Sequence, residues 1–333
     1  MRSPTLNELP PPPPGKTGWP WTEATPQVPD RTPDGSPWPR ISIVTPSYNQ
    51  GQFIEETIRS VLLQGYADLE YIIVDGGSTD ETVEIIKAYA EWLKYWVSEE
   101  DDGQADAINK GLRKSSGHVF GYINSDDVYQ KSIFQTLAKS YRSCVSPNEY
   151  CGVFSVVNFD ENKEELIEQD TDLGIDRWIR LGVSLHQPGV FWSINLLNEV
   201  GGFDNKYQYA FDRKFFMQLV IRNIKFAIDN NVIAAKFRIH ASSKSFQYSF
   251  NGTGFSDEFL QISTEILKIA PMKFRLSYRR YERQVYMSKK FATHKGTEVI
   301  NHNHRIKNIF DILKNYPDAV FTRFFWGMLL RSI

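Results

Sequence analysis

The sequence predicts an α/β fold in which helices flank a mixed, mostly parallel sheet. Three observations lead to this prediction. Short apolar segments alternate with segments of helical periodicity from residue 40 onward. Several apolar segments end abruptly in polar turns. The 333 residues are 41% hydrophobic, which suffices for one large core. Strands separated by helices pair in parallel through right-handed crossovers.

Residues 40–127 show the alternation most clearly. Four apolar segments are predicted as strands, at residues 41–44, 71–74, 95–97 and 119–123. Apolar residues at helical spacing predict three helices between them, at residues 53–62, 83–90 and 105–111. Ser78-Thr79-Asp80-Glu81 is expected to cap the second helix, and Gly111 is expected to end the third.

After residue 127 the pattern becomes mixed. Strands are predicted at residues 152–159, 189–192 and 232–239, and a helix at residues 211–221. We interpret this part as a continuation of the same sheet. It gives one domain over residues 40–250, with halves at residues 40–127 and 128–250. Residues 251–333 are expected to form a basic, aromatic and helical C-terminal region.

Residues 1–39 differ in composition from the rest of the chain. Prolines run without interruption from Pro10 to Pro14, which predicts extended or irregular backbone. The segment also has more large aromatic residues than a free linker needs: Trp19, Trp21 and Trp38. We therefore expect a strap along the surface of the domain. A linker and a docking ligand for a partner are the alternatives.

The net charge of −2 gives no global attraction to nucleic acid, so we expect no nucleic-acid partner. The charge is unevenly distributed. Residues 41–266 hold 20 basic and 32 acidic groups, whereas residues 267–333 hold 14 basic and four acidic groups. The acidic middle is compatible with a cation-binding site, and the basic tail with an anionic partner or surface.

Cys144 and Cys151 have the spacing of neither a metal site nor a redox motif. Neither a signal peptide nor an apolar run of about eighteen residues is recognisable. These features predict a cytoplasmic protein without a spanning helix.

The most informative feature is the adjacent pair Asp126-Asp127 at the end of the fourth predicted strand. Strand ends form the rim of a parallel sheet, where α/β proteins bind ligands. Adjacent carboxylates repel each other unless a positive group lies against them. A hard divalent cation, which prefers oxygen ligands and bridges to phosphates, is one solution. A solvated turn is the alternative.

The first and second predicted strands end at the same edge, in Thr45-Pro46-Ser47-Tyr48-Asn49 and Asp75-Gly76-Gly77-Ser78-Thr79-Asp80. Tyr48 could stack on a base, and Asp75 could accept hydrogen bonds from a base or a ribose. Gly76 would let a ligand approach the backbone closely. Either turn alone is also typical of an ordinary strand-to-helix connection.

Taken in order, these motifs resemble those of the family 2 glycosyltransferases. The resemblance includes Asp102-Gly103-Gln104 and Asn109-Lys110-Gly111 and covers about residues 40–245. It implies the GT-A type of Rossmann-like fold. No GxGxxG follows the first strand, which argues against a dinucleotide-dependent dehydrogenase.

The resemblance assigns roles to individual residues of the first half. Two turns would hold the nucleoside, through Thr45, Tyr48, Asn49, Asp75 and Gly76. A second segment would line the donor pocket, through Asp102, Gln104, Asp106, Asn109 and Lys110. Asp126 would lie nearer the ribose, and Asp127 would ligate Mg²⁺ or Mn²⁺ bridging the diphosphate.

The second half supplies the remaining matches. Asp212 resembles the family's catalytic base, with a helix N-cap as its alternative. His240 resembles a late histidine near the diphosphate, where it would ligate the metal or donate a hydrogen bond. A purely structural histidine is the alternative. His186 and Gln187 match a loop beside the acceptor site.

The resemblance therefore implies an inverting, metal-dependent transfer of a sugar from a nucleoside-diphosphate sugar, with UDP as the expected carrier. The acceptor would be a hydroxyl of a saccharide or lipid-linked saccharide, in surface polysaccharide or glycoconjugate biosynthesis. Two alternatives stay open: a sugar-phosphate nucleotidyltransferase, and a catalytically silent nucleotide-sugar-binding protein. The basic C-terminal region would either cover the sheet or make peripheral contact with the inner face of a membrane.

Overall fold

The structure is a computed structural model and describes residues 2–160, 162–174, 177–178, 185–241, 243, 254–269, 311 and 314. The chain divides into two compact units, Met1–Leu173 with Val183–Glu258 and Gly174–Gly182 with Phe259–Ile333. Nearly all of the basic and aromatic tail from residue 270 onward lies outside the described residues. No described helix is both long and apolar enough to cross a membrane.

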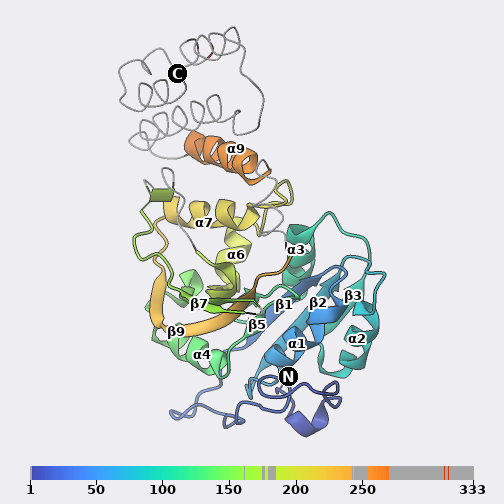
Figure 1. The fold of residues 1–333 in the computed structure, drawn as a ribbon. Helices are drawn as coiled ribbons and strands as arrows, with labels where there is room; N and C mark the ends of the chain where they lie inside the picture. The colour runs from blue at the N-terminus through green and yellow to red at the C-terminus, as the bar shows by residue number, and fades with distance from the viewer. Residues whose placement is uncertain are drawn as a thin grey trace. The chain divides into compact units, whose positions relative to one another are not determined.

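A nine-stranded sheet organises the first unit (Figure 1). Its parallel part has the order β3 (Tyr95–Ser98), β2 (Leu69–Asp75), β1 (Ile41–Ser47), β4 (Val119–Tyr122). The sheet continues through β8 (Val190–Ser193), β6 (Cys151–Phe159), β9 (Ala227–Arg238) and β5 (Val128–Tyr129), and β7 (Glu164–Ile167) pairs with β6. β8 is antiparallel to β4 and β6, whereas β9 runs parallel to β6. The predicted mixed α/β sheet is confirmed.

Helices cover both faces of the sheet because alternate residues of a strand point to opposite sides. Ile41 and Ile43 of β1 belong to the core shared with α1 (Gly51–Leu62), α2 (Thr82–Ala88) and α4 (Ile133–Ser143). Val44 points the other way and packs against α3 (Gln104–Lys114). The remaining described helices are α6 (Ile194–Val200), α7 (Phe211–Ile221) and α9 (Gly254–Ile269).

Of two local predictions, the one for Gly111 was wrong and the one for the cap of α2 is supported. Gly111 does not end α3, which continues to Lys114. A glycine is needed inside this helix because a Cβ would lie 2.5 Å from Cγ1 of Val44. Asp80 of the segment Ser78-Thr79-Asp80-Glu81 does cap α2, because its Oδ1 accepts a hydrogen bond from the backbone N–H of Thr82 (3.1 Å), the first residue of the helix. Its Oδ2 accepts a hydrogen bond from the backbone N–H of Gly51 (2.9 Å), which ties the start of α1 to α2.

Residues 2–39 belong to the same compact unit as the sheet. Leu9 and Trp38 are buried in the core that contains α1. Arg59 of α1 is fully buried, and its guanidinium donates to three carbonyl oxygens of the segment, those of Pro10, Pro20 and Trp21. These contacts support the proposal that the segment is a strap held against α1.

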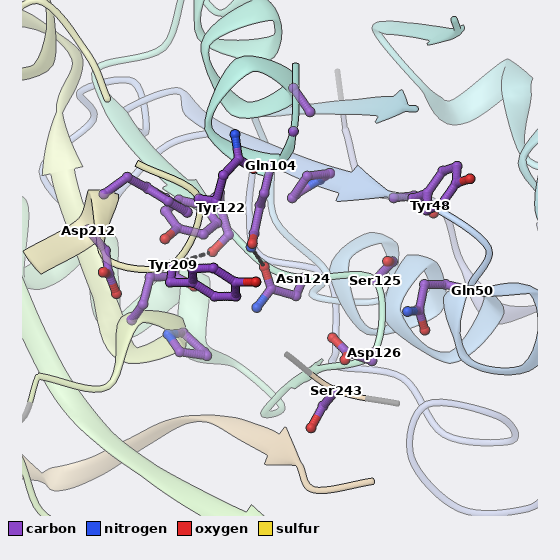
Figure 2. A pocket seen from close by; sticks show the side chains of 18 of the residues that line it. Tyr48, Gln50, Gln104, Tyr122, Asn124, Ser125, Asp126, Tyr209, Asp212 and Ser243 are labelled. Carbon is purple, nitrogen blue, oxygen red and sulfur yellow. Dashed lines mark hydrogen bonds between the residues drawn. The ribbon is translucent and has the colours of Figure 1, made fainter. Parts of the chain in front are cut away.

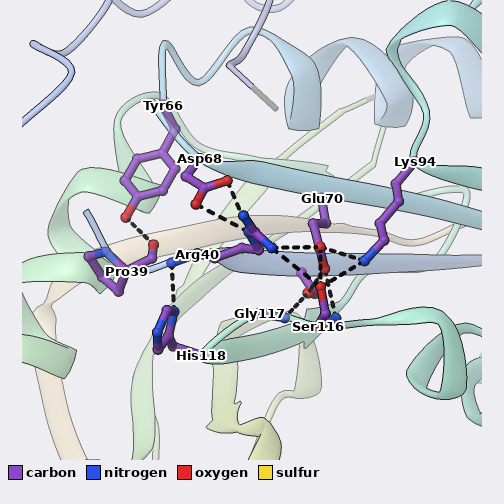
Figure 3. Close-up of polar contacts among 10 residues, drawn as sticks. Pro39, Arg40, Tyr66, Asp68, Glu70, Lys94, Ser116, Gly117 and His118 are labelled. Carbon is purple, nitrogen blue, oxygen red and sulfur yellow. Dashed lines mark hydrogen bonds and ion pairs between the residues drawn. The ribbon is translucent and has the colours of Figure 1, made fainter. Parts of the chain in front are cut away.

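A buried carboxylate joins the amino ends of the parallel strands (Figure 3). Glu70, near the start of β2, is 5% exposed. Four residues contact its carboxylate: Ser42 on β1, Arg40 just before β1, Lys94 just before β3 and Ser116 just before β4. We call Glu70 and these four residues the amino-end cluster. Burial alone would raise the pKa of Glu70, but the hydrogen bonds from Lys94, Ser116 and Ser42 outweigh it and lower the pKa to about 2.

Candidate active site

A cleft of about 1000 Å³ opens at the carboxyl ends of the parallel strands (Figure 2). All of its lining residues belong to the first compact unit. Seven of the predicted site residues line it: Tyr48, Gly76, Gln104, Asp126, His186, Gln187 and Asp212. Both halves of the predicted domain therefore contribute to one cavity.

The loop after β1 presents Tyr48 at one end of the cleft. The side chain is 61% exposed, and Figure 2 shows it at the opposite end from Asp212. Asn49 follows with a φ of 51°, a left-handed conformation that asparagine tolerates. Its side-chain oxygen accepts a hydrogen bond from the backbone N–H of Thr79 (2.9 Å). Asn49 thus ties the loops after β1 and β2 together rather than lining the cleft.

Asp75 and Thr45 lie buried behind this end of the cleft. Asp75 is fully buried and accepts hydrogen bonds from the backbone N–H of Ser78 (2.9 Å) and the hydroxyl of Ser98 (2.6 Å). Thr45, also buried, shares a hydrogen bond with the hydroxyl of Tyr71 (3.0 Å). Neither lines the cleft, but both support the loops that do.

Gln104, the first residue of α3, lies on the cleft wall. Its Nε2 donates to Oδ1 of Asn124 (2.6 Å), and Figure 2 shows the two side chains meeting. Asn124 lies two residues after the end of β4 and two residues before Asp126. The start of α3 and the turn that carries Asp126 are therefore joined by a hydrogen bond inside the cleft.

The other predicted donor residues do not line the cleft: Asp102, Asp106, Asn109 and Lys110. Lys110 forms ion pairs with Glu99 (2.9 Å) and Asp106 (3.5 Å). Nδ2 of Asn109 donates to the carbonyl oxygen of Phe203 (2.6 Å). These residues fix α3 against the surrounding loops.

The two adjacent acids have different surroundings. Asp126 lines the cleft, and its Oδ2 lies 2.9 Å from Nε2 of His240. Asp127 is fully buried, and its Oδ1 accepts a hydrogen bond from the backbone N–H of Arg238 (2.9 Å). Asp126 therefore faces the cleft in this structure, and Asp127 lies behind it.

Residues 238–240 contact the turn that carries Asp126 and Asp127 on two sides. Besides the backbone bond to Asp127, the guanidinium of Arg238 donates to the carbonyl oxygen of Asp126 (2.9 Å) and pairs with Glu56 (2.9 Å). Burial raises the pKa of Asp127 well above its ordinary value, and the neighbouring carboxylate of Asp126 adds to this shift. The turn is therefore rigidly supported on its inner side.

Asp126 and His240 fit a divalent cation as two of its ligands. A carboxylate oxygen and an imidazole nitrogen both suit Mn²⁺, while Mg²⁺ prefers oxygen and commonly completes its shell with water and phosphate. Among the described residues, no three His, Cys, Asp or Glu side chains form a group suited to a metal. The remaining coordination positions would therefore fall to a bound ligand or to water.

Asp212 lies in the first turn of α7, and Ala210 is the N-cap, so the N-cap alternative for Asp212 is wrong. Its Oδ1 accepts a hydrogen bond from the backbone N–H of Arg213 (2.6 Å). Burial raises the pKa of Asp212 to about 6, against an opposing effect of Arg213. A carboxylate with this pKa in a cleft is suited to general-base chemistry.

His186 and Gln187 lie on the same cleft, just before β8. Gln187 is 7% exposed, and its Nε2 donates to the carbonyl oxygen of Tyr122 (2.7 Å). Burial lowers the pKa of His186, which favours its neutral imidazole near pH 7. The structure thus brings this loop and Asp212 together.

Residues 42–164 match the family model Glycosyl transferase family 2. The chain is 26% identical over 187 residues to the uncharacterized glycosyltransferase MT1564 of Mycobacterium tuberculosis, which covers 55% of this chain and 70% of that protein. It is 41% identical over 96 residues to the putative teichuronic acid biosynthesis glycosyltransferase TuaG of Bacillus subtilis, which covers 28% of this chain and 38% of that protein. Over residues 42–164, the chain is therefore similar to glycosyltransferase family 2.

Solved structures share the fold of this chain. S. aureus TarS 1-349 in complex with UDP-GlcNAc has a TM-score of 0.55 at 15% identity, covering 84% of this chain and 82% of that chain. The mannosyltransferase PcManGT from Pyrobaculum calidifontis, in complex with GDP-Man and Mn²⁺, has a TM-score of 0.55 at 18% identity, covering 91% of this chain and 88% of that chain. The predicted GT-A fold is confirmed.

The sequence did not predict several residues that line the cleft, among them Asp101, Tyr122, Asn124 and Tyr209. Asn124 and Tyr209 lie within three residues of Asp126 and Asp212, so a search around each acid would have found them. Tyr122 lies on β4, where a core aromatic residue is equally typical, and its sequence context gives no further signal.

Proposed function

We propose that this enzyme transfers a sugar from a nucleoside-diphosphate sugar, with UDP as the carrier, to a hydroxyl of a saccharide or lipid-linked saccharide. The transfer inverts the anomeric centre, depends on Mg²⁺ or Mn²⁺, and serves surface polysaccharide or glycoconjugate biosynthesis. One observation carries the proposal: Asp212, with its pKa raised to about 6, lines the same cleft as Asp126, which lies beside His240.

Asp212 acts as the general base. It takes the proton from the acceptor hydroxyl as that oxygen attacks the anomeric carbon. A pKa of about 6 leaves the carboxylate mostly ionised at neutral pH while making it more basic than an exposed aspartate. The backbone N–H of Arg213 orients one oxygen, and the first turn of α7 favours the negative charge.

Asp126 and His240 would hold the cation. A cation bound there would supply Lewis-acid stabilisation for the negative charge of the departing nucleoside diphosphate. Asp127 and Arg238 keep the turn that carries Asp126 in place. At the other end of the cleft, the exposed ring of Tyr48 offers a stacking surface for the base.

The choice of donor is supported by the structural neighbours. TarS is in complex with UDP-GlcNAc, and PcManGT is in complex with GDP-Man and Mn²⁺. Both support a nucleoside-diphosphate sugar for this enzyme, and the second supports a divalent metal. The name of TuaG supports a polysaccharide acceptor.

We also propose that the C-terminal region brings the enzyme to an anionic membrane surface, where a lipid-linked acceptor would lie. Residues 267–333 carry 14 basic and four acidic groups, which anionic headgroups attract. The full-length protein should bind anionic vesicles at low salt and be released by added salt, because salt screens the attraction. Equal binding to neutral vesicles would contradict this part of the proposal.

Thermal unfolding with UDP, GDP and dTDP, each with and without Mn²⁺, tests the donor site. A ligand at one hundred times its dissociation constant stabilises a protein by about 2.7 kcal/mol, enough to raise Tm by several degrees. We expect a Mn²⁺-dependent shift with UDP. A shift with none of the nucleotides would contradict the proposed donor site.

Asp126→Asn and Asp127→Asn form a matched pair for this experiment. Asp126→Asn should abolish the Mn²⁺-dependent part of the shift, because it removes a cleft-facing carboxylate. Asp127→Asn should keep it, because the amide oxygen can still accept the hydrogen bond from Arg238. The opposite pattern would restore Asp127 as the metal ligand.

A further inference from the structure

One carboxylate from the start of α9 accepts hydrogen bonds from three consecutive backbone amides. Oε1 of Glu258 accepts from the N–H of Gln208 (2.8 Å). Oε2 accepts from the N–H groups of Tyr209 (2.9 Å) and Ala210 (2.8 Å). Consecutive N–H groups that converge on one point form an anion-binding concavity, and a carboxylate makes charge-assisted bonds there.

The loop held in this way is part of the cleft. Gln208 and Tyr209 line it directly, and Figure 2 shows Tyr209 among the side chains of the cleft. Ala210 is the N-cap of α7, so the position of this amide fixes the start of the helix that carries Asp212. Asp212 lies only two residues after the last amide that Glu258 binds.

The same loop also reaches the nucleotide half of the cleft. Nε2 of Gln208 donates to the carbonyl oxygen of Asp102 (3.0 Å). Gly103 has a φ of 103°, and a Cβ there would overlap the side-chain amide of Gln208. The loop is therefore fitted against α3 at one end and against Glu258 at the other.

We propose that Glu258 is a positioning residue for catalysis, which holds the loop of residues 208–210 and thereby sets where Asp212 meets the acceptor hydroxyl. This inference rests on the proposed role of Asp212 as the base. Misplacing a reacting group by about 1 Å can cost a hundredfold in rate, so an anchor on the helix start matters for chemistry. The predicted catalytic domain ended at residue 250 and so excluded this residue.

The charge of Glu258 has a second consequence. Burial is the main cause of the raised pKa of Asp212, Arg213 opposes it, and Glu258 adds to it. Tyr122, whose own pKa is raised mainly by burial, also faces Asp212. Loss of the charge at residue 258 should therefore move the acid limb of the pH–rate profile toward lower pH.

Glu258→Ala and Glu258→Gln test the proposal, with Gln261→Ala, an exposed position on the same helix, as the matched control. The measurements are nucleotide release from UDP-N-acetylglucosamine and GDP-mannose with Mn²⁺, and hydrogen exchange of the amides of Gln208, Tyr209 and Ala210. Glu258→Ala should exchange these amides about tenfold faster or more. It should lower kcat by about tenfold or more while KM for the donor changes less than about twofold.

Glu258→Gln keeps one acceptor oxygen but loses the charge. Its kcat should lie between those of wild type and Glu258→Ala, while its acid limb should shift as far as that of Glu258→Ala. The inference is overturned if Glu258→Ala keeps the amide protection or the kcat of the Gln261→Ala control. If the wild type releases no nucleotide from either donor, the proposed function fails, and this inference fails with it.

Discussion

Two carboxylates at opposite ends of the parallel strands have opposite pKa shifts. At the amino end, Glu70 receives hydrogen bonds from Lys94, Ser42 and Ser116, and its pKa falls to about 2 although burial opposes this (Figure 3). At the cleft, burial dominates and raises the pKa of Asp212 to about 6 (Figure 2). The same kind of side chain is stabilised as an anion at one end and destabilised at the other.

The opposite pKa shifts of Glu70 and Asp212 follow from the different roles of the two sites. The amino-end cluster joins four strands, and a permanent anion surrounded by donors and cations achieves this. A base has to take up and release a proton near neutral pH, so its charge cannot be fully compensated by the protein. The ionised base in the cleft therefore lowers the free energy of unfolding, whereas the ionised carboxylate of the amino-end cluster does not.

The largest effect should come from removing the base. Asp212→Asn should lower turnover by about a thousandfold, because general acid–base catalysis contributes about 10² to 10⁴. The same change should raise the free energy of unfolding by about 1–2 kcal/mol at pH 8, because it removes an ionised carboxylate whose pKa burial has raised to about 6.

The gain in stability has a defined pH window. The folded pKa of Asp212 lies above the ordinary value of 3.8, so the penalty in the wild type appears as the pH rises from 3.8 through about 6. Urea unfolding should show the two proteins converging below about pH 4. A destabilised Asp212→Asn at pH 8 would contradict the comparison.

Breaking the opposite end should cost stability and spare the cleft. Glu70→Ala should lower the free energy of unfolding by about 3 kcal/mol, because it leaves Lys94 and the backbone N–H of Ser116 without their buried partner. Donor-induced thermal shifts should keep their size. Glu84→Ala, at an exposed glutamate of α2, is the control and should change stability by less than about 0.5 kcal/mol.

Lowering the pH should have a smaller effect on the stability that Glu70 contributes. The folded pKa of Glu70 is depressed from 4.5 to about 2, so its contribution is fully present above pH 4.5 and is lost as the pH falls toward 2. The difference in unfolding free energy between wild type and Glu70→Gln should therefore shrink between about pH 5 and pH 3. A difference that stays constant over this range would mean that the charge of Glu70 does not stabilise the fold.

The sequence predicted the elements that have strong periodicity. The apolar segments that became β1 to β4, β6 and β8 were recognisable, and the predicted helix at residues 211–221 has the bounds of α7. It did not predict β5, which has two residues, or β7, whose residues Glu164–Ile167 are mostly exposed and include two glutamates. Such strands form because a neighbour offers free backbone groups, and that information is not local.

The site was predictable in its chemistry and less so in its geometry. The acids at the strand ends follow from the motifs, but which of two neighbours faces the cleft depends on the turn after β4, and Asp126 rather than Asp127 does so. Glu258 was not predictable at all. Its partners are backbone amides about fifty residues away, and backbone amides have no sequence signature.

The most direct test of this account is the pH dependence of kcat/KM for nucleotide release by the wild type. The profile should be level at neutral pH and fall with a slope of one below about pH 6, the pKa of Asp212. An acid limb near pH 4 would mean that Asp212 behaves as an ordinary exposed carboxylate. That result would contradict the claim that burial in the cleft raises the pKa of the base, in contrast to the compensated carboxylate at the other end of the strands.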